Sequence, residues 1–375
     1  MSAQAPHGGS AVFFAPARIN LIGEHIDYTQ GRVLPASLAL GTRVTLMPHS
    51  EPTLALHSIN LDERVVVPLP AASQRRRGHW SDYVIGVAWA LEQLGITLEG
   101  AQLQIDGNVP LGAGLASSAA LEVASALALL QRAGRELSAL ELALACQRAE
   151  SDWVGARCGP MDQLIAVCGR AQQALLIDCA SLESRVIDLP TDAAWILADT
   201  RVHHAHAGGE YNARRHESDQ LQEMARARLG DRCALRELSV AQAAALATSV
   251  SPTLARRLRH IVSENQRVLA AADALERSDL VALGALLKDS HRSLRDDYEV
   301  SCPELDTMVQ IACAQPGVHG ARLHGGGFGG CILMLAAAEQ APRISDTVRR
   351  AYAQATGLDP WMHLCNLGAG ARRIE

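Results

Sequence analysis

The chain is poor in aromatic residues, in lysine and in long apolar stretches. Of its 375 residues only 3% are aromatic, and one lysine, Lys288, stands among 34 Lys and Arg residues. The longest wholly apolar run, residues 331–338, is far too short to cross a bilayer as a helix. The first ten residues also lack the basic and apolar regions of a signal peptide. We therefore expect no membrane partner and a cytoplasmic location.

Disulfide, zinc and nucleic-acid signatures are missing as well. The nine cysteines are scattered without CxxC pairs, which is typical of reduced thiols in a cytoplasm and not of a disulfide framework or a zinc site. The net charge is −6, and arginines and acids are mixed along the chain. Apart from a short basic loop at residues 73–78, no basic stretch interleaved with aromatics is present, so no nucleic-acid partner is expected.

The content of hydrophobic residues, 48%, indicates a globular protein with a large core, and the length is typical of about two domains. Apolar alternation predicts strands at residues 43–47, 53–57 and 64–69, in a mostly antiparallel sheet. Short apolar runs predict further strands at 12–15 and 103–106, residues 15–38 are expected to form a charged loop, and a helix is expected over 138–154. Residues 209–297 are largely helical in pattern. Strands and helices mixed in this way, without regular βαβ units, predict two α+β domains.

A glycine-rich stretch, VPLGAGLASSAALEVASALALLQR at residues 109–132, is the most informative part of the chain. Gly112 and Gly114 let the backbone approach a ligand, and Ser117 and Ser118 open a long helix. Unpaired N–H groups at a helix N-terminus favour an anion, most often phosphate. The alternative is an ordinary turn, N-cap and buried helix. A Walker loop is excluded because no lysine follows the glycines, and the dinucleotide fingerprint lacks its third glycine.

Polar residues gather in two further places. Residues 15–38 concentrate Arg18, Glu24, His25 and Asp27 among apolar residues, which indicates either a partly buried site suited to sugar hydroxyls or a solvated turn with salt bridges. In CGPMDQ, residues 158–163, Asp162 follows a Gly-Pro pair that predicts a rigid turn presenting the carboxylate, although an acid at a helix start would look the same.

Two other stretches have structural and functional interpretations. Trp80 and Tyr83 open a helix expected over 82–94, where the pattern alone favours core packing over stacking on a base. A second glycine loop, HGGGFGG at residues 324–330, lies between two expected strands, 320–323 and 331–335.

Taken together, these motifs resemble those of the galactokinases within the GHMP small-molecule kinase family. ARINLIGEHIDY resembles the family's first, sugar-binding motif, PLGAGLASSAALEVA its second, ATP-binding motif, and RLHGGGFGGC its third. GEYNARR, CGPMDQ and SLRDDYEVSCPELD are further galactokinase-like segments. Each motif is weak alone, but six in the right order are specific.

The resemblance implies a fold and an activity. The fold is a two-domain α+β architecture, with a ribosomal-protein-S5-like α/β domain at residues 1–195 and a ferredoxin-like α+β domain at 196–375. The active site is expected between them. The implied reaction transfers the γ-phosphoryl group of ATP to the anomeric hydroxyl of α-D-galactose, with Mg²⁺ as cofactor. Its product is galactose 1-phosphate, and the reaction belongs to the Leloir pathway. A monomer or weak homo-oligomer is expected.

The resemblance also assigns roles to residues. Arg18 and Asp162 face the reacting hydroxyl, and whether Asp162 is a true base or orients the hydroxyl stays open. Ser118 and Glu150 hold Mg²⁺. The implied sugar-binding residues are Glu24, His25, Ile26, Asp27, Gly159, Asp162 and Tyr211. The implied nucleotide-binding residues are Ser58, Trp80, Tyr83, Gly112, Ala113, Gly114, Leu115, Ala116, Ser117 and Ser118.

The chain departs from the family pattern at a few positions. Ala116 replaces a common Ser, His324 and Gly326 replace Thr and Ala, and Ala180 replaces Arg. His324 either contacts phosphate or fills space. Ile26 replaces a common Thr, a variant also seen in N-acetylgalactosamine kinases. Two alternatives therefore stay open, namely a kinase for N-acetylgalactosamine or another hexose, and a non-catalytic sensor of galactose and ATP.

Overall fold

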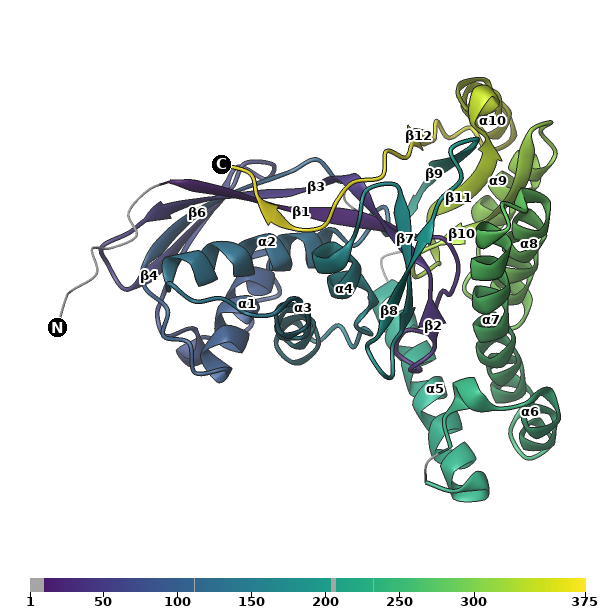
Figure 1. Ribbon diagram of the computed structural model, residues 1–375, viewed down its shortest axis with the longest axis horizontal. Helices are drawn as coiled ribbons and strands as arrows, with labels where there is room; N and C mark the ends of the chain where they lie inside the picture. Colours follow the sequence, from purple (N-terminus) through teal and green to yellow (C-terminus); the bar gives the residue numbers. More distant parts are fainter. Residues whose placement is uncertain (1–9, 111, 204–206, 232) are drawn as a thin grey trace.

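The computed structural model describes residues 10–110, 112–203, 207–231 and 233–375. Within these residues the strands form two sheets, one of nine strands and one of four, at the two ends of an elongated molecule (Figure 1). The first sheet contains β1 (Ala11–Asn20), β2 (Arg32–Val33), β3 (Pro35–Pro48), β4 (Thr53–Ser58), β5 (Glu63–Pro68), β6 (Ala101–Gly107), β7 (Gln173–Asp178), β8 (Ser184–Asp188) and β13 (Arg372–Arg373). The second contains β9 (Ala193–His203), β10 (Val318–His324), β11 (Gly329–Ala337) and β12 (Trp361–Leu364).

The first sheet is covered on one face by helices from the first half of the chain (Figure 1). These helices are α1 (Ser81–Gln93), α2 (Ser117–Arg132), α3 (Ala139–Arg148) and α4 (Met161–Cys168), with two short turns, η1 (Ala71–Ser73) and η2 (Ala149–Val154). Because α1 carries the chain back across the sheet, β6 pairs parallel with β4 while the other strand pairs are antiparallel. The mostly antiparallel expectation is therefore correct, apart from this one pair.

The second sheet packs against a bundle of helices. The elements of this part are α5 (Ala207–Leu229), η3 (Leu235–Glu237), α6 (Val240–Ala247), α7 (Pro252–Glu276), α8 (Leu280–Asp296), α9 (Pro303–Cys313), η4 (Ala338–Gln340) and α10 (Ala341–Thr356). Of these, α8 and α9 lie directly on β10, and α7 packs on α8 (Figure 1). None of the helices in the described ranges has the length and apolar character needed to cross a membrane.

One apolar core joins the two parts of the molecule. It runs from Ile19 and Ile26, near the end of β1, through Val268 of α7 to Ile196 and Leu333 of the second sheet. The last strand, β13, returns to pair with β1, so the end of the chain lies on the first sheet. The domain limits 1–195 and 196–375 stay a prediction, with β9 starting two residues before the proposed boundary.

Two expected elements are present but differ in their bounds. The strand expected at 12–15 continues to Asn20, with an irregularity between Pro16 and Arg18, where a proline is tolerated in the ladder. Arg18 therefore lies on a strand and not in a loop. The single helix expected over 138–154 ends at Arg148 and continues as a π-helical turn, a feature common at functional sites, and this turn carries Glu150.

Candidate functional site

Two neighbouring cavities meet at the N-terminus of α2, where Ser117 and Ser118 line both. The larger, about 420 Å³, is mostly apolar and also contains Ser58, Trp80 and Tyr83. We call it the apolar cavity. The other, about 320 Å³, is the polar cavity, which lies where the two glycine loops meet. The predicted residues that line it are Arg18, Glu24, His25, Asp27, Gly112, Gly114, Leu115, Ala116, Ser117, Ser118, Glu150, Asp162 and Tyr211.

The loop between β6 and α2 opens the helix N-terminus toward these cavities. Gly112 and Gly114 adopt positive φ angles of 77° and 69°. Ala116, the N-cap of α2, is also left-handed at φ 58° and provides no side-chain cap, so the first N–H groups of the helix stay available for an anion. A Cβ on Gly114 would lie 3.7 Å from Cα of Gly325, so the two glycine loops face one another.

Arg18 and Asp162 form a bidentate ion pair inside the polar cavity. Arg18 Nε and Nη2 donate to the two carboxylate oxygens of Asp162 at 2.8 and 2.9 Å, and Nη1 donates to the carbonyl of Gly114 at 2.6 Å. Burial opposes the charge of Arg18, but the neighbouring carboxylates outweigh it and raise the pKa of this guanidinium. A fixed cation therefore lies beside the glycine loop, and its two bonds hold the Asp162 carboxylate in a defined orientation.

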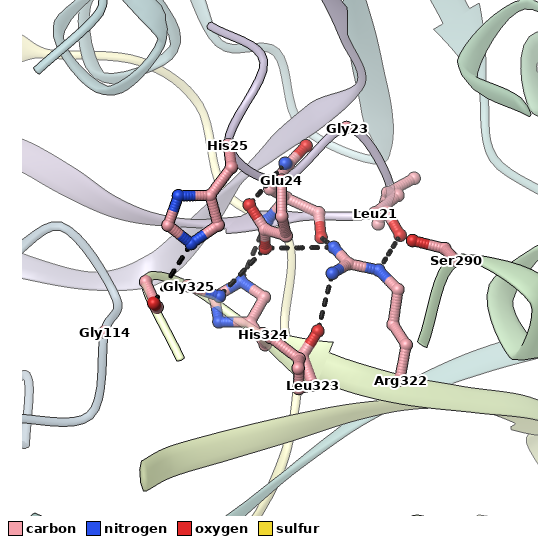
Figure 2. Close-up of polar contacts among 12 residues, drawn as sticks. Leu21, Gly23, Glu24, His25, Gly114, Ser290, Arg322, Leu323, His324 and Gly325 are labelled. Atoms are coloured by element: carbon pink, nitrogen blue, oxygen red, sulfur yellow. Dashed lines mark hydrogen bonds and ion pairs between the residues drawn. The ribbon is translucent and has the colours of Figure 1, made fainter. Parts of the chain in front are cut away.

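Glu24 is held by groups from both parts of the molecule (Figure 2). Its Oε1 accepts from Gly325 N at 2.8 Å and from Arg322 Nη2 at 3.1 Å, and its Oε2 accepts from Asn20 Nδ2 at 2.8 Å. Although burial alone would raise the pKa of Glu24, the charges of Arg322 and Arg18 lower it to about 2. Glu24 is therefore an ionised acceptor.

Asp27, which lines the polar cavity, is in close contact with Gly159. Gly159 N donates to Asp27 Oδ2 at 3.0 Å, and a Cβ on Gly159 would lie only 2.4 Å from that oxygen. Burial and the charge of Asp162 raise the pKa of Asp27 to about 6. This carboxyl group therefore changes its charge near neutral pH.

An aromatic cluster surrounds His25, which has a left-handed φ of 62°. Burial lowers the pKa of His25 to about 4, so the ring is neutral. Its Nε2 lies 3.0 Å from the carbonyl of Gly326 and must donate, which leaves Nδ1 to accept from Tyr28 Oη at 2.8 Å. The Tyr211 ring lies 5.4 Å from that of His25 and contributes to the same wall.

The residues proposed to hold a metal lie side by side. Glu150 accepts a hydrogen bond at 2.7 Å from Gln163 Nε2, and the nearby Ser118 hydroxyl lowers the pKa of Glu150. Burial outweighs this effect and raises the pKa of Glu150, which a nearby cation would oppose. In the described ranges no group of three or more His, Cys, Asp or Glu residues could hold a metal ion. One hydroxyl and one carboxylate nevertheless fit Mg²⁺ that takes its other ligands from phosphate and water.

The apolar cavity adds to one expectation drawn from pattern. Trp80 and Tyr83, expected from spacing to pack in the core, are half-buried and line this cavity, and Trp80 also packs against the core of the first sheet. Trp80 Nε1 donates to Glu63 at 2.7 Å, which fixes its indole ring. The sequence spacing could not reveal this because a helix face that lines a cavity has the same periodicity as one that meets a core.

Three of the predicted residues line neither cavity. Ile26 is fully buried in the apolar core, Ala113 is buried, and Gly159 donates its N–H to Asp27. Two of the departures from the family pattern can also be placed. His324 is buried and lines neither cavity, whereas Gly326 lines the polar cavity.

Sequence reasoning missed Asn20, Arg322 and Gln163. Arg322 is completely buried and donates to the carbonyls of Asn20 and Leu21. Gln163 Nε2 links Glu150 with the buried Glu122. The only available signal was a polar residue inside an otherwise apolar strand or helix, which is weak without a structure.

Comparison with known proteins agrees with this geometry. Residues 82–170 match the family model for the GHMP kinases N terminal domain, and residues 271–354 match the model for the GHMP kinases C terminal region. The Methanococcus jannaschii mevalonate kinase shares the fold, with a TM-score of 0.64 and 16% identity over 96% of this chain and 99% of that one. The fold is therefore that of a GHMP kinase.

More similar proteins define the family within this class. Residues 4–48 match the galactokinase galactose-binding signature. Galactokinases of Chloroflexus aurantiacus and Haemophilus influenzae strain PittGG are 42% and 40% identical, covering 97% and 96% of this chain and 93% and 94% of their own lengths. The Lactococcus lactis galactokinase complexed with galactose matches with a TM-score of 0.91 and 33% identity, over 97% of this chain and 95% of that one. The chain belongs to the galactokinase family.

Proposed function

We propose that this chain phosphorylates the anomeric hydroxyl of α-D-galactose with ATP, yielding galactose 1-phosphate and ADP. The observation that carries the proposal is the polar cavity itself. It combines the Arg18–Asp162 pair with a helix N-terminus that suits phosphate, and it adjoins the apolar cavity at Ser117 and Ser118. A sugar and a nucleotide bound in the two cavities would meet at this pair.

Sugar binding is assigned to the polar wall. Glu24 and Asp27 supply acceptors for sugar hydroxyls, and Glu24 is ionised at neutral pH. Their own hydrogen bonds hold them in place before the sugar arrives. Tyr211 closes the wall with an aromatic face of the kind that packs on the apolar side of a sugar. The support is that each of these side chains reaches the same cavity.

Nucleotide binding is assigned to the apolar cavity and to the glycine loop. Trp80 and Tyr83 would border the base, and Ser58 lies on the same wall. The N–H groups at the start of α2 would receive the phosphates. The loop offers no hydroxyl at Ala116, so Ser117 and Ser118 are its available side-chain donors.

The chemical step requires few groups. The sugar hydroxyl oxygen attacks the γ-phosphorus, the bond to the β,γ-bridging oxygen breaks, and ADP leaves. Arg18 stabilises negative charge on the transferring group, and Asp162 accepts the hydrogen of the attacking hydroxyl. Its bidentate bonds to Arg18 set the orientation of this carboxylate. Whether Asp162 takes the proton early or mainly orients the hydroxyl is decided by the pH and isotope dependence of turnover.

Mg²⁺ is proposed to bind at Ser118 and Glu150. When bound, it neutralises charge on the phosphate oxygens. The raised pKa of Glu150 supports the assignment, because a buried carboxylate without a cation is poorly stabilised. All nine cysteines are free thiols, which suits the expected cytoplasmic location. The monomeric or weakly associated state stays a prediction.

The test is ADP release across a sugar panel, with and without Mg²⁺. We expect turnover of galactose well above that of N-acetylgalactosamine, glucose, arabinose and galacturonate, and its loss without Mg²⁺. Preferential turnover of N-acetylgalactosamine would change the substrate assignment. Absence of turnover with every sugar, while galactose still raises the melting temperature, would identify a sensor and refute the kinase proposal.

A further inference from the structure

A buried histidine at the end of β10 makes a contact that neither cavity explains. His324 is 1% exposed, and its Nε2 lies 3.0 Å from the backbone N of Asn20, at the end of β1 (Figure 2). A backbone N–H can only donate, so this nitrogen must be the acceptor. The neutral ring therefore carries its proton on Nδ1. The contact joins the second sheet to the first across 304 positions of sequence.

Asn20 connects His324 with Glu24, a residue of the proposed sugar site. Its side-chain Nδ2 donates to Glu24 Oε2 at 2.8 Å, while Gly325, the residue after His324, donates its N–H to Glu24 Oε1 at 2.8 Å. The four residues form a closed ring of contacts. Asn20 donates to His324 and to Glu24, Glu24 accepts from Gly325, and the peptide bond between His324 and Gly325 closes the ring. The positions of both Glu24 carboxylate oxygens therefore depend on how β1 packs against His324.

The backbone N–H and carbonyl of Asn20 have separate partners. The N–H donates to His324 Nε2, and the carbonyl accepts from Arg322 Nη2. Asn20 is fully buried, so water cannot replace a lost acceptor without entering the core. The other ring nitrogen, Nδ1, has no hydrogen-bond partner among the described residues, which leaves Nε2 as the functional atom of the ring.

We propose that His324 is a positioning residue for sugar binding, whose Nε2 acceptor seats Asn20 and thereby aims the Glu24 carboxylate into the polar cavity. The inference rests on the proposed function and adds a residue that does not touch the sugar. Arg18, two residues before Asn20, has its own bonds to Asp162 and to the Gly114 carbonyl. Sugar affinity should therefore depend on His324 more strongly than the chemical step does.

The test compares two substitutions at one position. His324→Leu keeps the volume but removes the acceptor, and His324→Gln offers Oε1 as an acceptor of similar reach. We expect His324→Leu to raise the KM for galactose about tenfold or more. The value of kcat and the KM for ATP should stay within about threefold. His324→Gln should restore the galactose KM to within about threefold of the wild type.

A matched control is available on α8. His291 is also buried, and its Nδ1 accepts the backbone N–H of Leu323 at 3.2 Å, while its Nε2 lies 3.3 Å from Asp306 and away from Asn20 and Glu24. His291→Leu should lower the melting temperature without changing the galactose KM. A purely structural role for His324 would give the same result for both leucine variants, which would refute the proposal.

Two outcomes keep the test decisive when folding fails. If His324→Leu does not fold, the tautomer of His324 in the wild-type protein is measured instead, from the ¹⁵N chemical shifts of its ring nitrogens. These resonances are assigned as the ones that disappear in His324→Gln. The proposal requires an unprotonated Nε2 and a protonated Nδ1, and the opposite tautomer overturns it. If the wild-type chain turns over no sugar, the proposed function fails, whereas an unchanged galactose KM in an active His324→Leu enzyme overturns only the role of His324.

Discussion

Replacing Asp162 by Asn removes one charge from the polar cavity while keeping the shape of the side chain. The carboxylate now receives Arg18 Nε at 2.8 Å and Nη2 at 2.9 Å. An amide offers one acceptor, and its NH₂ group faces a guanidinium that can only donate. The variant therefore loses one charge-assisted bond, and it loses the acceptor proposed for the hydroxyl of the sugar.

The expected loss of activity is large. Loss of a group that accepts the proton or orients the nucleophile lowers kcat by at least about 100-fold, or about 2.7 kcal/mol of transition-state stabilisation. The cost in stability should be smaller, about 1–3 kcal/mol for a lost bond to a charged group. Glu24 and Asp27 still face Arg18, so its charge is not left alone.

A second ion pair provides the matched control. Asp178 has a side chain 20% exposed, close to the 22% of Asp162, and it pairs with Arg236 and Arg32 away from the cavities. Asp178→Asn should lower the melting temperature by a similar amount and leave kcat within about twofold.

The assay is steady-state ADP release with galactose, together with calorimetric galactose binding for each variant. We expect Asp162→Asn to bind galactose and to turn it over at least about 100-fold more slowly. A folded Asp162→Asn enzyme with kcat within tenfold of the wild type would remove Asp162 from the reacting hydroxyl, and the reasoning from the bidentate pair would fail.

Three other changes test the remaining parts of the site. Because burial and Asp162 raise the pKa of Asp27 to about 6, this group is protonated below that pH, and galactose KM should rise as the pH falls through 6. Asp27→Asn should abolish this slope, and a slope that persists would assign it to another group. Glu150→Gln should raise the Mg²⁺ concentration for half-maximal turnover by about tenfold or more, and an unchanged Mg²⁺ titration would exclude Glu150 as a ligand. Gly159→Ala places a Cβ 2.4 Å from Asp27 Oδ2, so the melting temperature and galactose affinity should both fall, and normal binding would contradict the close contact.

Local sequence was enough to predict the parts of the site that depend on neighbouring residues. The glycine loop, the start of α2 at Ser117 and the strand before it follow from φ requirements, capping and apolar periodicity within about 25 residues. Asp162 lies in the first turn of α4, which begins at Met161, so of its two interpretations the acid at a helix start is the one confirmed.

Local sequence failed where a residue's environment comes from distant segments. Trp80 and Tyr83 line a cavity that the sequence spacing did not distinguish from the core, and Ile26 packs in the core and lines neither cavity. The strand that reaches Asn20 was expected to end before Arg18, because the charge of Arg18 is balanced by carboxylates outside this strand, above all Asp162.

The sequence by itself determined which chemical groups are present and in which order, because loops, caps and motif spacing are properties of contiguous residues. Only the tertiary structure decided which of these groups meet. Glu24 is ionised and oriented because Arg322 and Gly325, about 300 residues away, bind it where the two sheets join. His324 acts on the same carboxylate without touching the cavity. Such contacts depend on how two cores pack together, which no local pattern encodes.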